Sequence, residues 1–186
     1  MHSLPLYKTE QVDKLAWPQA QLAVTLHSPA LEVMTDFTIR EPIVIDDDTP
    51  AVELERLMKQ SHVKMKLVLD KNDQFVGIVT LTDLSAQRIM QKVSEGRSRE
   101  ELSARDFMQP KTTLHSFDYE QLSRAKVGDV VETLKNNGHH HCLVTDRDSH
   151  EIRGVISVSD IARILRLPLD IQQQPTFAEL SKILAA

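Results

Sequence analysis

The sequence predicts a mixed α/β (α+β) fold built from two copies of one structural unit. The phrase GIVTLTD at residues 77–83 recurs as GVISVSD at residues 154–160, with the glycine, both hydroxyls and the carboxylate in the same places. Upstream of it, KLVLD at 66–70 aligns with CLVTD at 142–146. A duplication of this kind indicates that the fold itself is repeated.

Each unit reads as a helix, two strands and a second helix. Thr49-Pro50 is typical of a helix start, and the apolar residues that follow recur at helical spacing. Two short apolar runs flanking a polar turn then predict a β-hairpin. The elements predicted in the first unit are a helix after Pro50, strands at 67–69 and 75–80, and a helix at about 82–91. Those predicted in the second unit are a helix at 128–134, strands at 143–144 and 152–157, and a helix at 160–167.

Polar side chains mark the point where the second strand of each unit passes into a helix. They are Thr80 with Asp83, and Ser157 with Asp160. Free backbone N–H groups at a helix start suit a phosphate, and a carboxylate can accept hydrogen bonds from both hydroxyls of a ribose. Ser, Thr and Asp are also common helix N-caps, so a purely structural role stays open. Their recurrence at one register favours a nucleotide site.

Two further segments complete a resemblance to a known family. EVMT at 32–35 and RDFMQP at 105–110 resemble the short helix that opens a CBS (cystathionine β-synthase) domain. With both hairpins and both Gly-to-Asp phrases, the chain resembles a tandem CBS pair, or Bateman module, over about residues 28–168. The resemblance implies two β-α-β-β-α units packed sheet to sheet around a pseudo-twofold axis.

The resemblance also implies a ligand and a mode of assembly. CBS pairs bind adenosine-containing molecules in the clefts between repeats, through a hydroxyl and a carboxylate that correspond here to Thr80, Asp83, Ser157 and Asp160. AMP, ADP or ATP is the expected ligand, and S-adenosylmethionine and NAD are alternatives. No cofactor is required. CBS modules usually pair, so we expect a homodimer that signals to a protein partner the sequence does not name.

A histidine run, residues 139–141, precedes the first strand of the second hairpin. In the γ subunit of AMP-activated protein kinase, basic residues at this place meet the phosphates. The resemblance therefore implies phosphate contacts from His140, His141 and, in the first unit, Lys64, whereas Met65 departs from the pattern. A solvated strand entrance is the alternative. A zinc site is a third interpretation, but it would need further ligands, and we expect no metal.

Composition excludes several other classes of function. The chain has 186 residues and a net charge of −5, which argues against nucleic acid as a partner. No apolar stretch approaches the ~20 residues that span a bilayer, and no secretory pattern opens the chain, so we expect a cytoplasmic protein away from the membrane. The single cysteine, Cys142, fits a reducing compartment and reads as a buried hydrophobe.

The chain is expected to divide at its composition changes. The predicted parts are an N-terminal extension (1–27), CBS repeat 1 (28–91), a polar linker (92–104), CBS repeat 2 (105–168) and a C-terminal amphipathic helix (169–186).

No catalytic motif appears, so no catalytic residue and no enzymatic activity are predicted. Three hypotheses follow. The chain is a stand-alone nucleotide sensor, which we favour; a ligand-free dimerisation scaffold whose clefts are empty; or an unrecognised nucleotide hydrolase that uses the histidine run.

Overall fold

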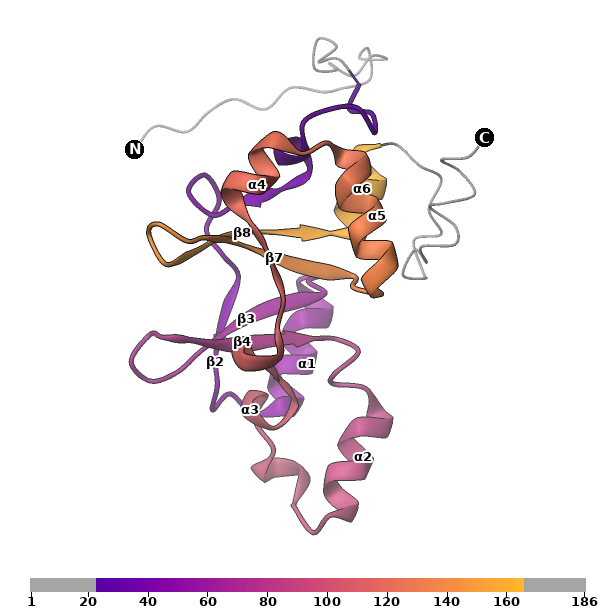
Figure 1. Ribbon diagram of the computed structural model, residues 1–186. Helices are drawn as coiled ribbons and strands as arrows, with labels where there is room; N and C mark the ends of the chain where they lie inside the picture. Colours follow the sequence, from indigo (N-terminus) through magenta and orange to yellow (C-terminus); the bar gives the residue numbers. More distant parts are fainter. Residues whose placement is uncertain (1–22, 166–186) are drawn as a thin grey trace, which may run out of the picture.

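A computed structural model describes residues 23–165, which form two four-stranded sheets that face each other, with helices on both outer sides (Figure 1). The first sheet has the order β2-β3-β4-β5 and the second the order β1-β8-β7-β6. In each sheet one parallel pair flanks an antiparallel hairpin. The mixed fold of two repeated units is therefore confirmed.

The strands are β1 (Thr35–Asp36), β2 (Val44–Asp46), β3 (Met65–Leu69), β4 (Phe75–Thr80), β5 (Gln109–Pro110), β6 (Ser116–Asp118), β7 (His141–Asp146) and β8 (Glu151–Ser157). The α-helices are α1 (Ala51–Gln60), α2 (Ala86–Ser94), α3 (Ala104–Phe107), α4 (Tyr119–Arg124), α5 (Val127–Asn137) and α6 (Val158–Ile164), and the 3-10 helices are η1 (Ala30–Val33), η2 (Arg99–Glu101) and η3 (Lys111–Thr113).

The two long outer helices form because their apolar residues share one face. Helix α1 buries Ala51, Leu54 and Met58 at spacings of three and four residues. Helix α5 buries four residues at the same kind of spacing and ends at Gly138, whose left-handed φ of 67° closes the last turn. Each helix thereby covers the outer face of its sheet.

The helices that follow the two hairpins differ from the prediction, and from each other. Helix α2 begins at Ala86 and not near residue 82, because Thr80 and Asp83 bond to each other and hold residues 81–84 in a turn. Helix α6 begins at Val158, directly after the N-cap Ser157, so Asp160 lies in its first turn. The predicted C-terminal helix (169–186) and most of the extension (1–27) lie outside the described residues.

Three clusters of apolar side chains make up the core. Two lie between a sheet and its helices, one in each half. The third joins the two sheets and is centred on Leu67, Ile78 and Leu143. Because successive strand residues point to opposite faces, neighbours such as Val68 and Val79 pack toward the helices instead. The sheet-to-sheet packing that the repeats implied is therefore present.

The two opening segments are exchanged between the halves. Ala30 and Val33 of η1 are buried in the core of the second half, and β1 pairs with β8. Reciprocally, Ala104 and Phe107 of α3 are buried in the core of the first half, where β5 pairs with β4. Each half is therefore completed by a segment that precedes the other half in the sequence.

This exchange explains the glycine that opens each repeated phrase. A Cβ at Gly77 would lie less than 3.0 Å from the carbonyl oxygen of Gln109, and one at Gly154 equally close to that of Thr35. In both cases the obstacle is the backbone of the crossing strand, which has no flexible end to move aside. Glycine is therefore required for steric reasons, independent of any ligand.

We expect Gly154→Ala to lower the free energy of unfolding by about 2 kcal/mol or more, because β1 must separate from β8 to admit the methyl group. Urea denaturation of the purified variant measures this. The matched control is Glu151→Ala at an exposed position of the same strand, which should stay within about 0.5 kcal/mol of the wild type. Equal stability of both variants would contradict the assigned strand exchange.

Candidate functional site

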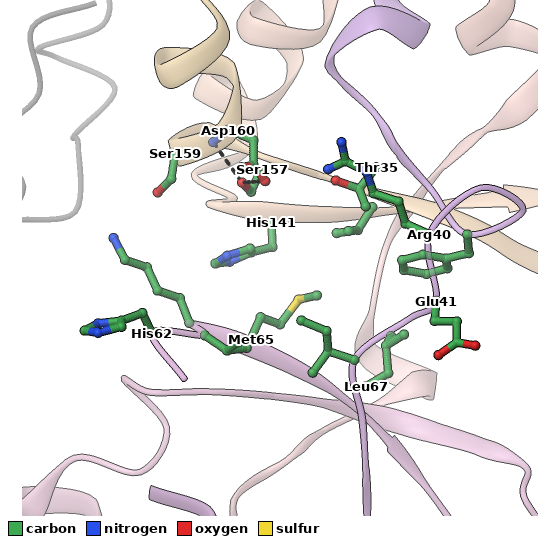
Figure 2. Close-up of a pocket in the computed structure, with 15 residues that line it drawn as sticks. Thr35, Arg40, Glu41, His62, Met65, Leu67, His141, Ser157, Ser159 and Asp160 are labelled. Atoms are coloured by element: carbon green, nitrogen blue, oxygen red, sulfur yellow. Dashed lines mark hydrogen bonds between the residues drawn. The ribbon is translucent and has the colours of Figure 1, made fainter. Parts of the chain in front are cut away.

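Two clefts lie between the halves. The larger, here called the Asp160 cleft, has a volume of about 430 Å³. Figure 2 shows Ser157, Ser159 and Asp160 on one wall, Met65 and Leu67 on the opposite wall, and His141 between them. The strand-to-helix junction of the second half thus faces β3 of the first half. The described residues that line it are Thr35, Phe37, Arg40, Glu41, Ile43, His62, Val63, Lys64, Met65, Leu67, His141, Val155, Ser157, Ser159 and Asp160.

The polar end of this cleft is formed by Ser157 and Asp160. The Ser157 hydroxyl donates to Asp160 Oδ2 at 2.7 Å and accepts from the Asp160 backbone N–H at 3.0 Å. Arg163 donates to the other carboxylate oxygen at 2.7 Å. Burial by itself would raise the pKa of Asp160, but hydrogen bonds from Ser157 and Arg163 outweigh it and lower the pKa. The carboxylate is ionised and 34% exposed, so acceptor positions remain open toward the cleft.

An apolar slot lies beside this polar end. Phe37 and Ile43 come from the stretch that joins β1 to β2, Val63 and Met65 from the entry to β3, and Val155 from β8. Residues from both halves therefore enclose the slot. An apolar wall next to a few convergent polar groups is the usual composition of a small-molecule site.

Basic side chains stand at the rim. Lys64, His62 and Arg40 line the Asp160 cleft, and Figure 2 shows His62 and Arg40 on opposite sides of it. Within residues 23–165, no carboxylate lies at salt-bridge distance from Lys64. Its ammonium group therefore remains available to an anionic ligand.

The second cleft, the Asp83 cleft, has a volume of about 340 Å³ and a more polar lining. Asp83 is only 4% exposed, and its oxygens already accept several hydrogen bonds. Oδ2 accepts from the Thr80 N–H at 2.9 Å, from the Thr80 hydroxyl at 2.6 Å and from the Gln109 amide at 3.1 Å, whereas Oδ1 accepts from Arg88 at 2.6 Å. The lining is Ile78, Thr80, Thr82, Asp83, Arg88, Gln109, Gly138, His139, His140 and His141.

His141 belongs to both clefts. Burial lowers the pKa of its imidazole to about 4, and the nearby His140 and Lys64 act in the same direction, against the opposing charges of Asp160 and Asp83. At neutral pH the ring is uncharged and offers one N–H donor. The phosphate contact that the resemblance implies for His141 stays a prediction, and the neutral ring would make it through this N–H.

The predicted site residues separate into two groups. Lys64, Ser157 and Asp160 meet in one cleft, Thr80, Asp83 and His140 in the other, and His141 touches both. Other residues that line the clefts were not predicted from the sequence. Thr35 and Gln109 each follow a Met in the paired opening motifs, so an alignment of those motifs could have marked them. Arg88 had no such signal. The residues not predicted include Thr35, Phe37, Arg40, His62, Met65, Arg88, Gln109 and Val155.

Two negative findings concern other classes of site. In the described part of the chain, no cluster of three or more His, Cys, Asp or Glu side chains is arranged to hold a metal ion. In that same part, every helix is too short or too polar to cross a membrane.

Comparison with known proteins identifies the family. The CBS domain family matches residues 32–88 and 104–167, which together make up most of the chain. The chain belongs to the CBS domain family. The tandem CBS repeats that the duplicated phrases suggested are thus confirmed.

The curated relatives carry no assigned function. An uncharacterized protein of Methanopyrus kandleri is 26% identical over 126 residues, which cover 67% of this chain and 58% of that protein. Uncharacterized protein YlbB of Bacillus subtilis is 31% identical over 86 residues, which cover 42% of this chain and 57% of YlbB. This CBS chain therefore spans a little over half the length of each relative.

Solved structures share the fold. An uncharacterized conserved protein of Pyrococcus horikoshii gives a TM-score of 0.57 at 19% identity, covering 79% of this chain and 98% of that one. CBSX2 in complex with AMP gives 0.53 at 20% identity, covering 73% and 94%. The CBS domain of a bacterial CNNM/CorC family Mg²⁺ transporter in complex with ATP gives 0.53 at 16% identity, covering 77% and 91%.

The partly buried His141 should make the free energy of unfolding decrease as the pH drops through a defined window. Its folded-state pKa of about 4 lies below the usual histidine value of 6.5, so the unfolded chain binds more protons between these values. Stability is lost as the pH drops from about 6.5 to 4, by up to about 3 kcal/mol from this group. Urea denaturation across that range should show a smaller decrease in the free energy of unfolding for His141→Gln than for the wild type.

The control is His27→Gln, which removes an exposed histidine and should leave the pH dependence unchanged. Parallel pH profiles for the wild type and His141→Gln would contradict the assigned burial of the neutral ring.

Proposed function

We propose that this CBS pair is a regulatory module that binds an adenosine-containing nucleotide in the Asp160 cleft and transmits its occupancy to a protein partner. The observation that carries the proposal is that one cleft combines an apolar slot, an exposed ionised carboxylate with an adjacent hydroxyl, and a cationic rim. These features match the base, the ribose and the phosphates of one ligand.

The ribose would bind at the polar end. Both of its hydroxyls can donate to Asp160, whose oxygens each hold a single hydrogen bond from another side chain. The Ser157 hydroxyl stands beside them and keeps the carboxylate oriented. Hydrogen bonds to a charged acceptor contribute about 1.5–3 kcal/mol each, enough to fix the sugar.

The base and phosphates would occupy the two remaining regions. A flat purine fits against Phe37, Met65 and Val155, where it loses apolar surface to water. Lys64 and His62 would face the phosphates, and His141 would add an uncharged N–H donor. The cationic rim favours AMP, ADP or ATP over S-adenosylmethionine, and NAD is a further candidate.

Related structures support this class of ligand. CBSX2 was solved in complex with AMP, and the CBS domain of a bacterial CNNM/CorC family transporter in complex with ATP. Both share the fold of this chain, and their ligands belong to the class that the Asp160 cleft suits.

Regulation would follow from the position of the cleft. Its walls come from β3 in one half and from β8 and α6 in the other, so a ligand contacts both and stabilises one relative arrangement. A partner, or a second copy in a homodimer, that prefers this arrangement must raise the nucleotide affinity by the same factor. The competing function is a dimerisation scaffold whose clefts hold no ligand. In that case the role of Ser157 would be to cap α6, through the hydrogen bond that its hydroxyl accepts from the Asp160 N–H.

We expect Asp160→Asn to weaken AMP or ATP binding at least tenfold, because the ribose hydroxyls lose a charged acceptor. Isothermal titration calorimetry measures the affinity. Thermal shift is a quick first screen, since ligand at 100 times Kd adds about 2.7 kcal/mol to the native state.

Asp148→Asn, an equivalent change in the exposed β7–β8 turn, is the matched control and should retain wild-type affinity. A wild-type protein that is free of copurified ligand and gives no response to AMP, ADP, ATP, NAD or S-adenosylmethionine would favour the scaffold. Turnover of ATP with Mg²⁺ would instead favour a hydrolase.

A further inference from the structure

We infer that the chain's own side chains close the Asp83 cleft to ribose, so that each chain binds one nucleotide, at the Asp160 cleft alone. The inference rests on the proposed function, and it specifies which of the two related clefts binds the nucleotide. The repeated phrase places the same hydroxyl and carboxylate in both clefts, so the difference must come from their surroundings.

The first difference is the state of the carboxylate. Asp83 accepts hydrogen bonds from Thr80, Arg88 and Gln109 and is nearly buried, whereas Asp160 is one-third exposed. Each carboxylate accepts a hydrogen bond from a guanidinium, Arg88 at Asp83 and Arg163 at Asp160, so the difference lies in the near-complete burial of Asp83 and in its bond from Gln109. A ribose at Asp83 would have to displace this amide from a charged acceptor and enter a position that is almost closed to solvent.

The second difference is the side chain that the exchanged strand brings to each cleft. Gln109 pairs with Ile78 on β4, just as Thr35 pairs with Val155 on β8, so the two residues occupy equivalent places in the clefts. Gln109 is long enough to reach Asp83, at 3.1 Å. Thr35 has no amide, and within residues 23–165 it makes no side-chain hydrogen bond to Asp160. The residue at this place in each exchanged segment is therefore one of the differences between the closed cleft and the open one.

The third difference is the missing slot for a base. Met65 pairs with Thr80 as His141 pairs with Ser157, so Met65 and His141 are equivalent. By the same alignment, Val63 corresponds to His139. The Asp83 cleft thus has imidazoles at positions where the Asp160 cleft has apolar side chains. Among the described residues, Ile78 is the one aliphatic side chain that lines it. A purine gains little by entering it.

The decisive experiment is the binding stoichiometry. Calorimetric titration of the full chain with AMP and with ATP should give about one site per chain, and Asp160→Asn should remove it. Two sites per chain, or a single site that survives Asp160→Asn, would overturn the inference and leave nucleotide binding intact. No binding of any adenosine nucleotide would instead overturn the proposed function.

Reciprocal substitutions test the role assigned to Gln109. Thr35→Gln should place an amide against Asp160 and weaken AMP binding at least tenfold without lowering Tm. Gln109→Thr should lower Tm, because buried Asp83 loses a donor, and should retain one site per chain. Unchanged affinity in Thr35→Gln, or unchanged Tm in Gln109→Thr, would show that this amide does not distinguish the clefts.

Discussion

The close approach of two crossing strands to Gly77 and Gly154 is the contact on which the rest of this CBS pair depends. At each glycine, the carbonyl of a strand from the preceding segment occupies the space that a side chain would need. The exchange completes both four-stranded sheets and brings η1 and α3 into the cores of the opposite halves. Neither half holds a complete core of its own, so the two halves are expected to fold as one cooperative unit.

The same strands decide the chemistry of the clefts. Because β1 pairs with β8 as β5 pairs with β4, their first residues, Thr35 and Gln109, line the clefts that hold the repeated carboxylates. A short hydroxyl side chain leaves Asp160 open, and a long amide engages Asp83. The repeats carry the same hydroxyl–carboxylate pair, but Thr35 and Gln109 in the exchanged segments give the two carboxylates different surroundings. In the proposed function, Asp160 holds the ligand, whereas Asp83 stabilises the junction between β4 and α2.

His141 lies where the two clefts meet, and its environment links them. Burial keeps the ring neutral, and the charges that act on it come from Lys64 and from the carboxylates of both clefts. A phosphate placed near this ring would favour its protonated form, so the nucleotide binding that we propose would be thermodynamically coupled to proton uptake. In the proposed function, His141 would therefore act as a partly buried, uncharged hydrogen-bond donor.

The sequence alone determined the repeats, the hairpins and the hydroxyl–carboxylate pairs, because these depend on local periodicity, turn chemistry and short-range hydrogen bonds. It also placed α1 and α5 within a few residues, from apolar spacing. Only the tertiary structure decided which half each opening segment completes and which carboxylate stays open. Gln109 lies 26 residues from Asp83, and strand pairing brings them together. The neutrality of His141 likewise follows from burial, which no local pattern encodes.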